Sequence, residues 1–257
     1  MAQVLVVADD LTGANATGAR FARTGMRVAT VTPEHVAVVA DDYDVVVANL
    51  DSRSLPPQHA ADLVTDVVEA VWPVSLVVKR VDSTLRGNIG AEVEAALRAV
   101  RDRAPAHTRA RALFVPAFPA SGRVTVDGVQ LLDGVPLERT ELAFDPTWPM
   151  STGLVADLLA EQTDLSVRHV PIRQVTQTML AADLMTGDEA VVLCDALDER
   201  HLEDIAEAAA ERSAGTARCG CPWIPGPPAR SWPRRCGCAG RAVRGARCWP
   251  SRAATPA

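Results

Sequence analysis

The chain has 257 residues and a formal net charge of −6, long enough for one large α/β domain or two small ones. Apolar residues make up 48% and charged residues 23%, shares that exclude disorder of the whole chain. No apolar run approaches the roughly 18 residues of a membrane span, and the first ten residues lack the basic region of a secretory signal. We therefore expect a cytoplasmic protein with no membrane partner.

The first hundred residues alternate between short valine-rich runs and longer amphipathic segments. The short runs predict buried strands because they are apolar and rich in β-branched residues, and the amphipathic segments predict helices. The expected strands are 3–8, 26–32, 44–49 and 75–81, and the expected helices are 12–24, 57–71 and 89–101. Strands that alternate with helices of this length indicate βαβ units and a mainly parallel sheet.

The pattern changes after a fifth expected strand at 112–116. Two Asp-Gly pairs between residues 123 and 137 separate short apolar runs, which predicts a β-hairpin. A loop at 144–149 follows, and the remaining expected elements are a helix from 153, a strand at 167–170, a helix from 174, a strand at 190–194 and a helix from 199. The predicted fold class is α/β, with a mainly parallel sheet flanked by helices, a β-hairpin insertion and an irregular C-terminal tail.

The composition changes sharply at residue 213. Residues 213–257 contain eight arginines, nine alanines, seven prolines and six glycines, but no leucine and no acidic residue. The net charge is −14 for residues 1–212 and +8 for the tail. Because the tail has no apolar periodicity, it should form no core. We divide the chain into a domain at 1–212 and a low-complexity tail at 213–257.

The tail allows three interpretations. Its arginines would attract nucleic-acid phosphates. Cys219-Gly-Cys221 and Cys236-Gly-Cys238 offer thiols for zinc, although zinc pairs usually have two to four residues between the cysteines. The third interpretation is an out-of-frame translation, because the tail is dominated by residues whose codons contain only G and C. We favour the third interpretation and expect no nucleic-acid partner and no bound metal.

Polar residues follow several of the expected strands, at the edge where open α/β sheets bind ligands. Asp9 and Asp10 follow the first strand, where carboxylates suit a general base, a metal site or a helix cap. Arg53 follows the third strand and could bind a carboxylate or phosphate through two parallel hydrogen bonds, or simply be solvated. The loop at 116–123 contains two prolines and a glycine, which predicts a rigid bend.

The densest polar cluster is KRVDSTLRGN at 79–88. It combines cations, a carboxylate and hydroxyls at a strand–helix junction, where backbone N–H groups add affinity for an anion. Lys79 is the only lysine beside 25 arginines, which indicates a role for a compact ammonium group, the alternative being an ordinary strand-end residue. The cations suit an anion, and the hydroxyls and carboxylates suit a polyol. An acid sugar would satisfy both.

Sequence motifs for other ligands are missing from residues 1–212. There is no G-x-x-x-x-G-K-[ST] loop and no G-x-G-x-x-G fingerprint, so we assign no nucleotide-binding residue. There is also no H-E-x-x-H motif, and the five histidines are scattered, so we assign no metal ligand.

Five motifs carry a family resemblance: ADDLTGANATG, SRSLPP, KRVDSTLRGNIGAE, FVPAFPASGRVTVDGVQLLDGVPL and FDPTWP. In this order they closely resemble the four-carbon acid sugar kinases, ATP-dependent enzymes that phosphorylate threonate, erythronate or 3-oxo-tetronate. The resemblance covers about residues 3–212, which correspond to that family's N-terminal sugar-acid-binding domain. The family's ATP-binding domain follows it, and here we expect the tail to stand in its place.

The resemblance implies a small-molecule sugar acid as ligand and ATP with Mg²⁺ as cofactors. Arg53 and Lys79 should neutralise the carboxylate of the sugar acid, and hydroxyl side chains should bind its hydroxyl groups. One aspartate, Asp10 or Asp82, should orient and deprotonate the attacking hydroxyl, which makes both candidate catalytic residues. The full set of expected substrate-binding residues is Asp9, Asp10, Arg53, Lys79, Asp82, Ser83 and Thr84.

Two functions from different classes remain open. The chain is a kinase by family in an interrupted form that is inactive alone, or it is a non-catalytic acid-sugar-binding domain that works with a separate nucleotide-binding chain. The DNA beyond the codon for Ser213 distinguishes them, because a glycine-rich α/β domain in another reading frame would indicate the interrupted kinase. The sequence assigns neither the particular sugar acid nor the oligomeric state.

The change of composition generates a prediction about proteolysis. Limited digestion of the 257-residue chain should leave a resistant core that ends near residue 212, because the tail contains no leucine, no acidic residue and no apolar periodicity. Mass spectrometry of the fragments measures the end point. A tail that resists digestion as well as the domain does would contradict the out-of-frame interpretation.

Overall fold

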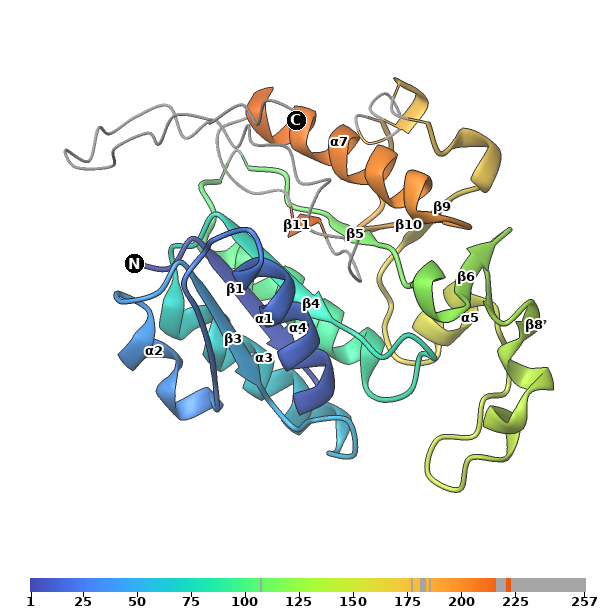
Figure 1. Cartoon of the computed structure of the whole chain (residues 1–257), viewed down its shortest axis with the longest axis horizontal. Helices are drawn as coiled ribbons and strands as arrows, with labels where there is room; N and C mark the ends of the chain where they lie inside the picture. The colour runs from blue at the N-terminus through green and yellow to red at the C-terminus, as the bar shows by residue number, and fades with distance from the viewer. Residues whose placement is uncertain (107, 177, 181–183, 185, 216–220, 223–257) are drawn as a thin grey trace, which may run out of the picture.

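The structure is a computed structural model that describes residues 1–222, apart from 107, 177, 181–183, 185 and 216–220 (Figure 1). Expected and observed elements agree closely over most of this range. The first sheet and its helices consist of β1 (Val4–Ala8), α1 (Leu11–Ala22), β2 (Val28–Val31), α2 (Val36–Val39), β3 (Val45–Asn49), α3 (Pro57–Val71), β4 (Leu76–Arg80) and α4 (Ile89–Arg103). The short helix α2 is the one element here that the sequence analysis did not predict.

The remaining elements build the second half of the domain. They are β5 (Ala112–Phe114), β6 (Arg123–Val126), β7 (Val129–Leu132), β8 (Val135–Pro136), α5 (Val155–Ala160), β9 (Val167–Val170), β10 (Val191–Cys194), α7 (Glu199–Gly215) and β11 (Cys221–Pro222). The helix expected from residue 174 is preceded by a short 3₁₀ turn at Ile172–Gln174, and much of it falls on residues outside the description.

The first sheet is parallel and has the strand order β2-β3-β1-β4. Its central strand β1 pairs with β3 on one side and β4 on the other, so that Ala8 lies opposite both Asn49 and Arg80. Because the strands are parallel and in register, their carboxyl ends meet at one edge. This edge brings together the loops after β1, β3 and β4.

Successive residues of these strands point to opposite faces, which are covered by different helices. Val4, Val6 and Val78 share a buried cluster with Phe21 of α1. Leu5, Val7 and Val77 belong instead to the larger core that contains residues of α3 and α4. Figure 1 shows α1 on one side of the sheet and α3 and α4 on the other. A strand residue therefore faces α1 or α4 according to its place in this alternation.

The parallel strands in the described part of the chain form two sheets. The second has the order β11-β5-β10-β9, and β6, β7 and β8 form a small antiparallel sheet beside it. The predicted hairpin is confirmed, with turns at Asp127-Gly128 and Asp133-Gly134. All four turn residues have positive φ, between 50° and 81°, as two-residue hairpin loops require.

The boundary expected at residue 212 falls inside an element. Helix α7 continues to Gly215, and β11 pairs with β5 in parallel, with Cys221 opposite Ala112. The tail beyond residue 222, including the second cysteine pair, lies outside the described residues, and its expected irregular structure stays a prediction.

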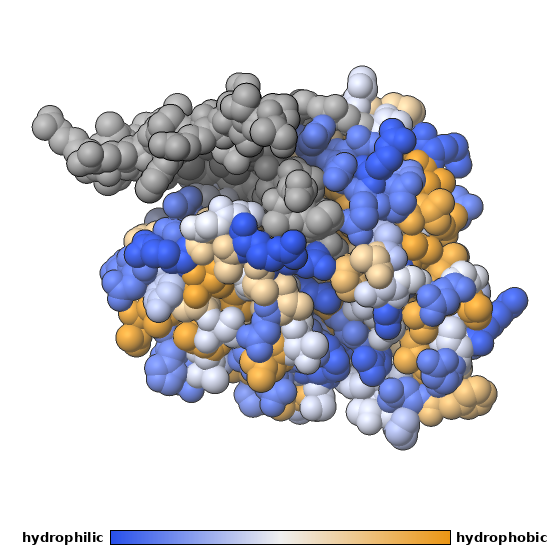
Figure 2. Space-filling model, viewed as in Figure 1, coloured by the Kyte–Doolittle hydropathy of each residue, from blue (hydrophilic) through white to orange (hydrophobic). Residues whose placement is uncertain are grey.

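The described surface mixes polar and apolar residues. On the face that Figure 2 shows, hydrophobic residues are interspersed among hydrophilic ones. Across the described residues, no helix combines the length and hydropathy needed to cross a lipid bilayer.

Phe114 offers a test of the core. Its side chain is completely buried at the end of β5, whereas Phe144 is 87% exposed. Phe114→Ala should lower the free energy of unfolding by about 3–5 kcal/mol, because it removes a large apolar side chain and leaves a cavity. Phe144→Ala, the matched control, should change it by less than about 0.5 kcal/mol. Urea denaturation measures both, and similar losses for the two variants would contradict this core.

Candidate functional site

The candidate site lies at the carboxyl edge of the first sheet. Because β1 lies between β3 and β4, the residues that follow β1 are flanked by the Arg53 loop on one side and by the 82–86 loop on the other. The sequence analysis expected Arg53 and Lys79 at one edge of one sheet, and β3 and β4 do end at this common edge. Strand order thus explains why residues more than 40 positions apart in the sequence meet.

Arg53 binds both aspartates that follow β1. Its Nε donates to Asp9 Oδ2 at 2.7 Å, and its Nη2 lies 2.9 Å from Asp10 Oδ2. Burial alone would lower the pKa of Arg53, but the hydrogen bond and charge of Asp9, with the charges of Asp82 and Asp10, raise it well above its ordinary value. The guanidinium group is therefore a fixed positive charge that bridges two carboxylates.

Asp10 also caps helix α1. Its Oδ1 accepts a hydrogen bond of 2.7 Å from the Gly13 backbone N–H, so both of its carboxylate oxygens are occupied. A Cβ at Gly13 would lie 2.7 Å from Asp10 Oδ1 and 3.3 Å from Cγ of Arg80. Only glycine fits between these two side chains without displacing one of them.

Asp82 is held by two donors of its own loop. Its Oδ2 accepts from Thr84 Oγ1 at 2.7 Å and from Arg86 Nε at 2.6 Å. Burial by itself would raise the pKa of Asp82, but the hydrogen bonds from Arg86 and Thr84 and the charge of Arg53 outweigh it, so the pKa is lowered. Arg86 also lies 3.7 Å from Asp145, a residue of the FDPTWP motif.

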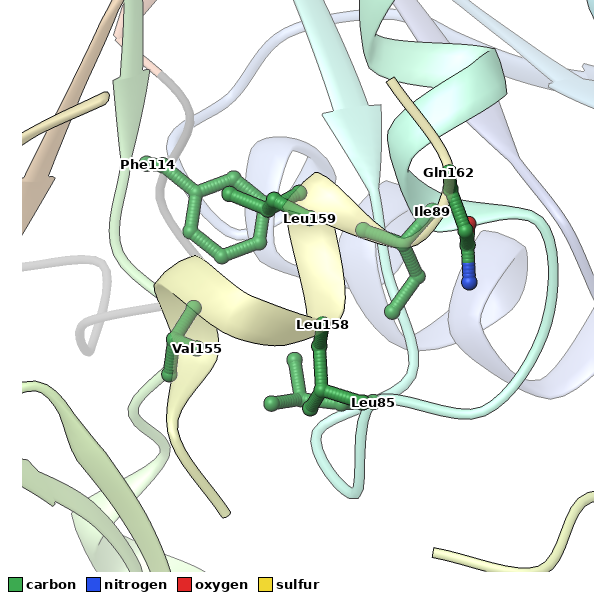
Figure 3. A pocket seen from close by; sticks show the side chains of 7 residues that line it. All are labelled: Leu85, Ile89, Phe114, Val155, Leu158, Leu159 and Gln162. Carbon is green, nitrogen blue, oxygen red and sulfur yellow. The ribbon is translucent and has the colours of Figure 1, made fainter. Parts of the chain in front are cut away.

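Leu85 shapes this loop through an unusual backbone conformation. Its φ of 61° is in the left-handed region, which is rare for a branched apolar residue and costs about 1–3 kcal/mol. Its buried side chain lies in an apolar pocket between α4 and α5 (Figure 3). The other residues that line the pocket are Ile89, Phe114, Val155, Leu158, Leu159 and Gln162. Burial of the side chain offsets the backbone strain.

Three buried side-chain atoms at this edge have no hydrogen-bond partner among the described residues. They are Nη1 of Arg80, the last residue of β4, Oδ1 of Asn49, the last residue of β3, and Oδ1 of Asp9. Asp9 is only 3% exposed, and burial lowers the pKa of Arg80 although Asp9, Asp82 and Asp10 oppose the shift. An unsatisfied buried donor or acceptor costs about 1–3 kcal/mol, so such atoms call for an explanation.

Lys79 faces the opposite side of β4 from Arg80. Its Nζ lies 2.7 Å from Glu92 Oε2, and both side chains are at most 2% exposed. The same Glu92 accepts a hydrogen bond from the Ser52 hydroxyl through its other oxygen. Lys79 therefore already has a buried carboxylate partner on α4.

A hairpin residue reaches the same loop from the second half of the domain. Gln130, which is completely buried in β7, donates to the Ser83 carbonyl oxygen at 2.9 Å and accepts from Thr125 Oγ1 at 2.6 Å. The hydrogen bond from Gln130 therefore fixes the backbone carbonyl group of Ser83.

A model of sugar-binding N-terminal domains matches residues 4–221. This chain belongs to that family. The domain is 38% identical over 218 residues to a D-erythronate kinase of Heliobacterium modesticaldum, covering 81% of this chain and 48% of that protein. It is also 39% identical over 223 residues to a D-threonate kinase of Salmonella typhimurium, and this match covers 82% of this chain and 49% of that protein. The resemblance to four-carbon acid sugar kinases is confirmed, and the chain spans about half the length of these relatives.

A solved structure supports the fold. A domain of unknown function from Bordetella bronchiseptica, crystallised as a domain-swapped dimer with bound citrate, has a TM-score of 0.74 and 28% identity. The match covers 90% of this chain and 55% of that one. The α/β fold class expected from the sequence is thereby confirmed for the sugar-binding domain.

The structure of the domain groups most of the expected site residues. Asp9, Asp10, Arg53 and Asp82 form one cluster of charges, and Thr84 joins it through Asp82. Sequence reasoning gave no separate role to Arg80, Glu92 or Gln130. For Arg80 a signal was available, because the alternation along β4 places it on the α1 face with Val78.

A second polar cluster lies at the end of β10 and contains none of the expected substrate-binding residues. Buried Asp195 accepts hydrogen bonds from the backbone N–H groups of Asp127, Gly128 and Ile172, and it lies 2.9 Å from His169 Nε2. These bonds attach the hairpin turn to the second sheet. Among the described residues, no group of three or more His, Cys, Asp or Glu side chains is arranged to hold a metal ion.

Thr84→Val tests the lowered pKa of Asp82. A carboxylate with a lowered folded-state pKa stabilises the fold above its unfolded pKa of about 3.9, and this stability is lost as the pH falls through the folded-state value. The variant should therefore unfold more easily than wild type at pH 7, by about 1–2 kcal/mol, and the difference should shrink toward pH 3. Denaturant unfolding at several pH values measures this. A difference that is independent of pH would mean that Thr84 does not act through Asp82.

Proposed function

We propose that the domain binds a four-carbon sugar acid, such as threonate, erythronate or 3-oxo-tetronate, at the carboxyl edge of the first sheet. The family match and the names of the kinase relatives support a sugar acid as ligand. The site supports it chemically, because it combines guanidinium groups for a carboxylate with carboxylates for hydroxyl groups.

The unpartnered atoms at this edge carry the proposal. Arg80 Nη1 is a donor and Asp9 Oδ1 is an acceptor, both buried and both at the ends of adjacent strands. A sugar acid would satisfy the donor through its carboxylate and the acceptor through a hydroxyl group. Arg80 thereby takes the carboxylate contact that the sequence analysis had expected of Lys79.

The local positive charge at Arg80 favours an anionic group there. Arg53 and Arg86 are paired with Asp9, Asp10, Asp82 and Asp145, whereas Arg80 Nη1 has no hydrogen-bond partner among the described residues. The N-terminus of α1, where Asp10 caps Gly13, adds a positive potential next to Arg80. A carboxylate near Arg80 would be stabilised by the guanidinium group and by the positive potential of the helix N-terminus.

The catalytic roles expected of Asp10 and Asp82 stay predictions. Asp10 uses both oxygens for Arg53 and Gly13, and the lowered pKa of Asp82 makes it a weak base. Asp9 Oδ1 is the better placed acceptor for the hydroxyl group that reacts. Phosphoryl transfer depends mainly on positioning and charge neutralisation, so this aspartate would orient the hydroxyl group more than it would activate it.

The cofactor and the whole reaction remain part of the proposal. The relatives are kinases, so ATP and Mg²⁺ are the expected cofactors, and the described residues contain no group of three or more His, Cys, Asp or Glu side chains arranged around a metal ion. We assign the described residues to the sugar acid alone. A cytoplasmic location and action with a separate nucleotide-binding chain also remain proposals. Incubation of the chain with the sugar acids and MgATP tests whether it transfers phosphate by itself.

Calorimetry with threonate, erythronate and 3-oxo-tetronate tests the proposed site. Arg53→Ala and Arg80→Ala should each weaken binding by about 10- to 100-fold, because a charge-assisted hydrogen bond contributes about 1.5–3 kcal/mol. Arg98→Ala is the matched control, since Arg98 is an exposed arginine on α4 that pairs with Glu94, and binding should not change. Unchanged affinity in both site variants would exclude this edge as the binding site, and no binding by the wild type would contradict the proposed function.

A further inference from the structure

Beneath the candidate site lies a buried ionic network that does not face the ligand edge. Lys79 of β4 and Glu92 of α4 form an ion pair of 2.7 Å, and both are almost completely shielded from solvent. Moving two charges out of water is costly unless each is fully partnered. Lys79 Nζ also donates to the Arg80 carbonyl oxygen at 3.0 Å, so the ammonium group is occupied on both sides.

The network extends from this pair to the loop after β3. Glu92 Oε2 binds Lys79, and Glu92 Oε1 accepts from the Ser52 hydroxyl, whose residue is completely buried. Asn88 adds two hydrogen bonds to the same loop, from its Nδ2 to the Ser52 and Leu55 carbonyl oxygens at 3.1 and 2.7 Å. Glu92 of helix α4 therefore holds the side chain of Ser52, and Asn88, the residue before the helix, holds the backbone of Ser52 and Leu55.

Arg53 lies within this hydrogen-bonded segment, 52–55. A Cβ at Gly87 would lie 3.0 Å from Arg53 Cγ, so the arginine stem is packed against the backbone just before α4. With Ser52 fixed on one side and Gly87 on the other, the guanidinium group is directed to Asp9 and Asp10.

We propose that Lys79 and Glu92 are positioning residues that hold Arg53 in place through Ser52, and that Lys79 makes no contact with the ligand. Lys79 supplies the charge that allows Glu92 to be buried, Glu92 anchors Ser52, and Ser52 fixes the neighbouring Arg53. The effect on ligand affinity rests on the proposed function, whereas the effect on Arg53 itself does not.

Two variants separate positioning from direct contact. Ser52→Ala removes the anchor and leaves every charge in place. Lys79→Gln/Glu92→Gln removes both charges but keeps amide groups that can bind each other and Ser52. Ser166→Ala is the control, because the Ser166 hydroxyl also takes part in one hydrogen bond, with the Ala190 N–H, at the far end of the second sheet.

Hydrogen exchange of the Arg53 Nε–H, followed by NMR, reports on Arg53 without any ligand. In wild type this N–H is bonded to Asp9 and should exchange slowly, and Ser52→Ala should accelerate exchange by about tenfold. Ser166→Ala should leave it unchanged. Unchanged Arg53 exchange in Ser52→Ala would overturn the proposal, whether or not the chain binds a sugar acid.

Calorimetry with the three sugar acids completes the test. If Lys79 only positions Arg53, ligand affinity and the exchange rate of the Arg53 Nε–H should change together. In Ser52→Ala the affinity should fall and the exchange rate should rise, each by about tenfold. In the double variant Lys79→Gln/Glu92→Gln each should change by less than about twofold. If Lys79 contacts the ligand, the double variant should lose affinity as Arg53→Ala does while Arg53 exchange stays as in wild type. That outcome would overturn the proposal. A wild-type chain that binds none of the acids would refute the proposed function alone, because the exchange measurement still decides the role of Ser52.

Discussion

Several charges must share the edge of one small sheet with little water to screen them, and this constraint governs the architecture around them. A buried charge is tolerated only when it is paired and hydrogen-bonded. Arg53 pairs with Asp9 and Asp10 together, and Arg86 pairs with Asp82. The placement of β1 between β3 and β4 is what allows partners from three loops to meet. The glycines at 13 and 87 then remove the side chains that would keep these partners apart.

The sequence predicted the strands and helices well because their signals are local. Valine-rich runs and amphipathic segments act over five to fifteen residues, and the bounds of α3 agree with the expected 57–71. The meeting of Asp9, Arg53 and Asp82 at one edge was predicted for a related reason, since polar residues directly after parallel strands must gather there. The division of the parallel strands into two sheets and the helix α2 were not foreseen. The first depends on which strands pair over long distances, and α2 is only four residues long.

Lys79 and Arg80 show where sequence reasoning was incomplete. The sequence analysis assigned ligand contact to Lys79 and no separate role to Arg80 without considering which face of β4 each residue occupies, although adjacent strand residues face opposite sides of a sheet. Val77 packs toward α3 and α4, so Lys79 meets Glu92, and Val78 packs toward α1, so Arg80 approaches Gly13. The face of the sheet that each residue occupies could have been derived from the alternation along β4. The pairing of Lys79 with the Glu92 carboxylate on α4 could not, because it depends on how the helix packs against the sheet.

The left-handed backbone at Leu85 has a consequence for how this domain can change. A glycine there would relieve the backbone strain but would forfeit the contacts of the leucine side chain with the pocket between α4 and α5. Deleting a buried leucine side chain costs about 2–5 kcal/mol, which exceeds the strain that is relieved, so the exchange should lower the stability of the fold. The loop that holds Asp82, Thr84 and Arg86 would also lose its attachment to α4 and α5. A single apolar side chain under backbone strain thus couples the stability of the core to the shape of the charged loop.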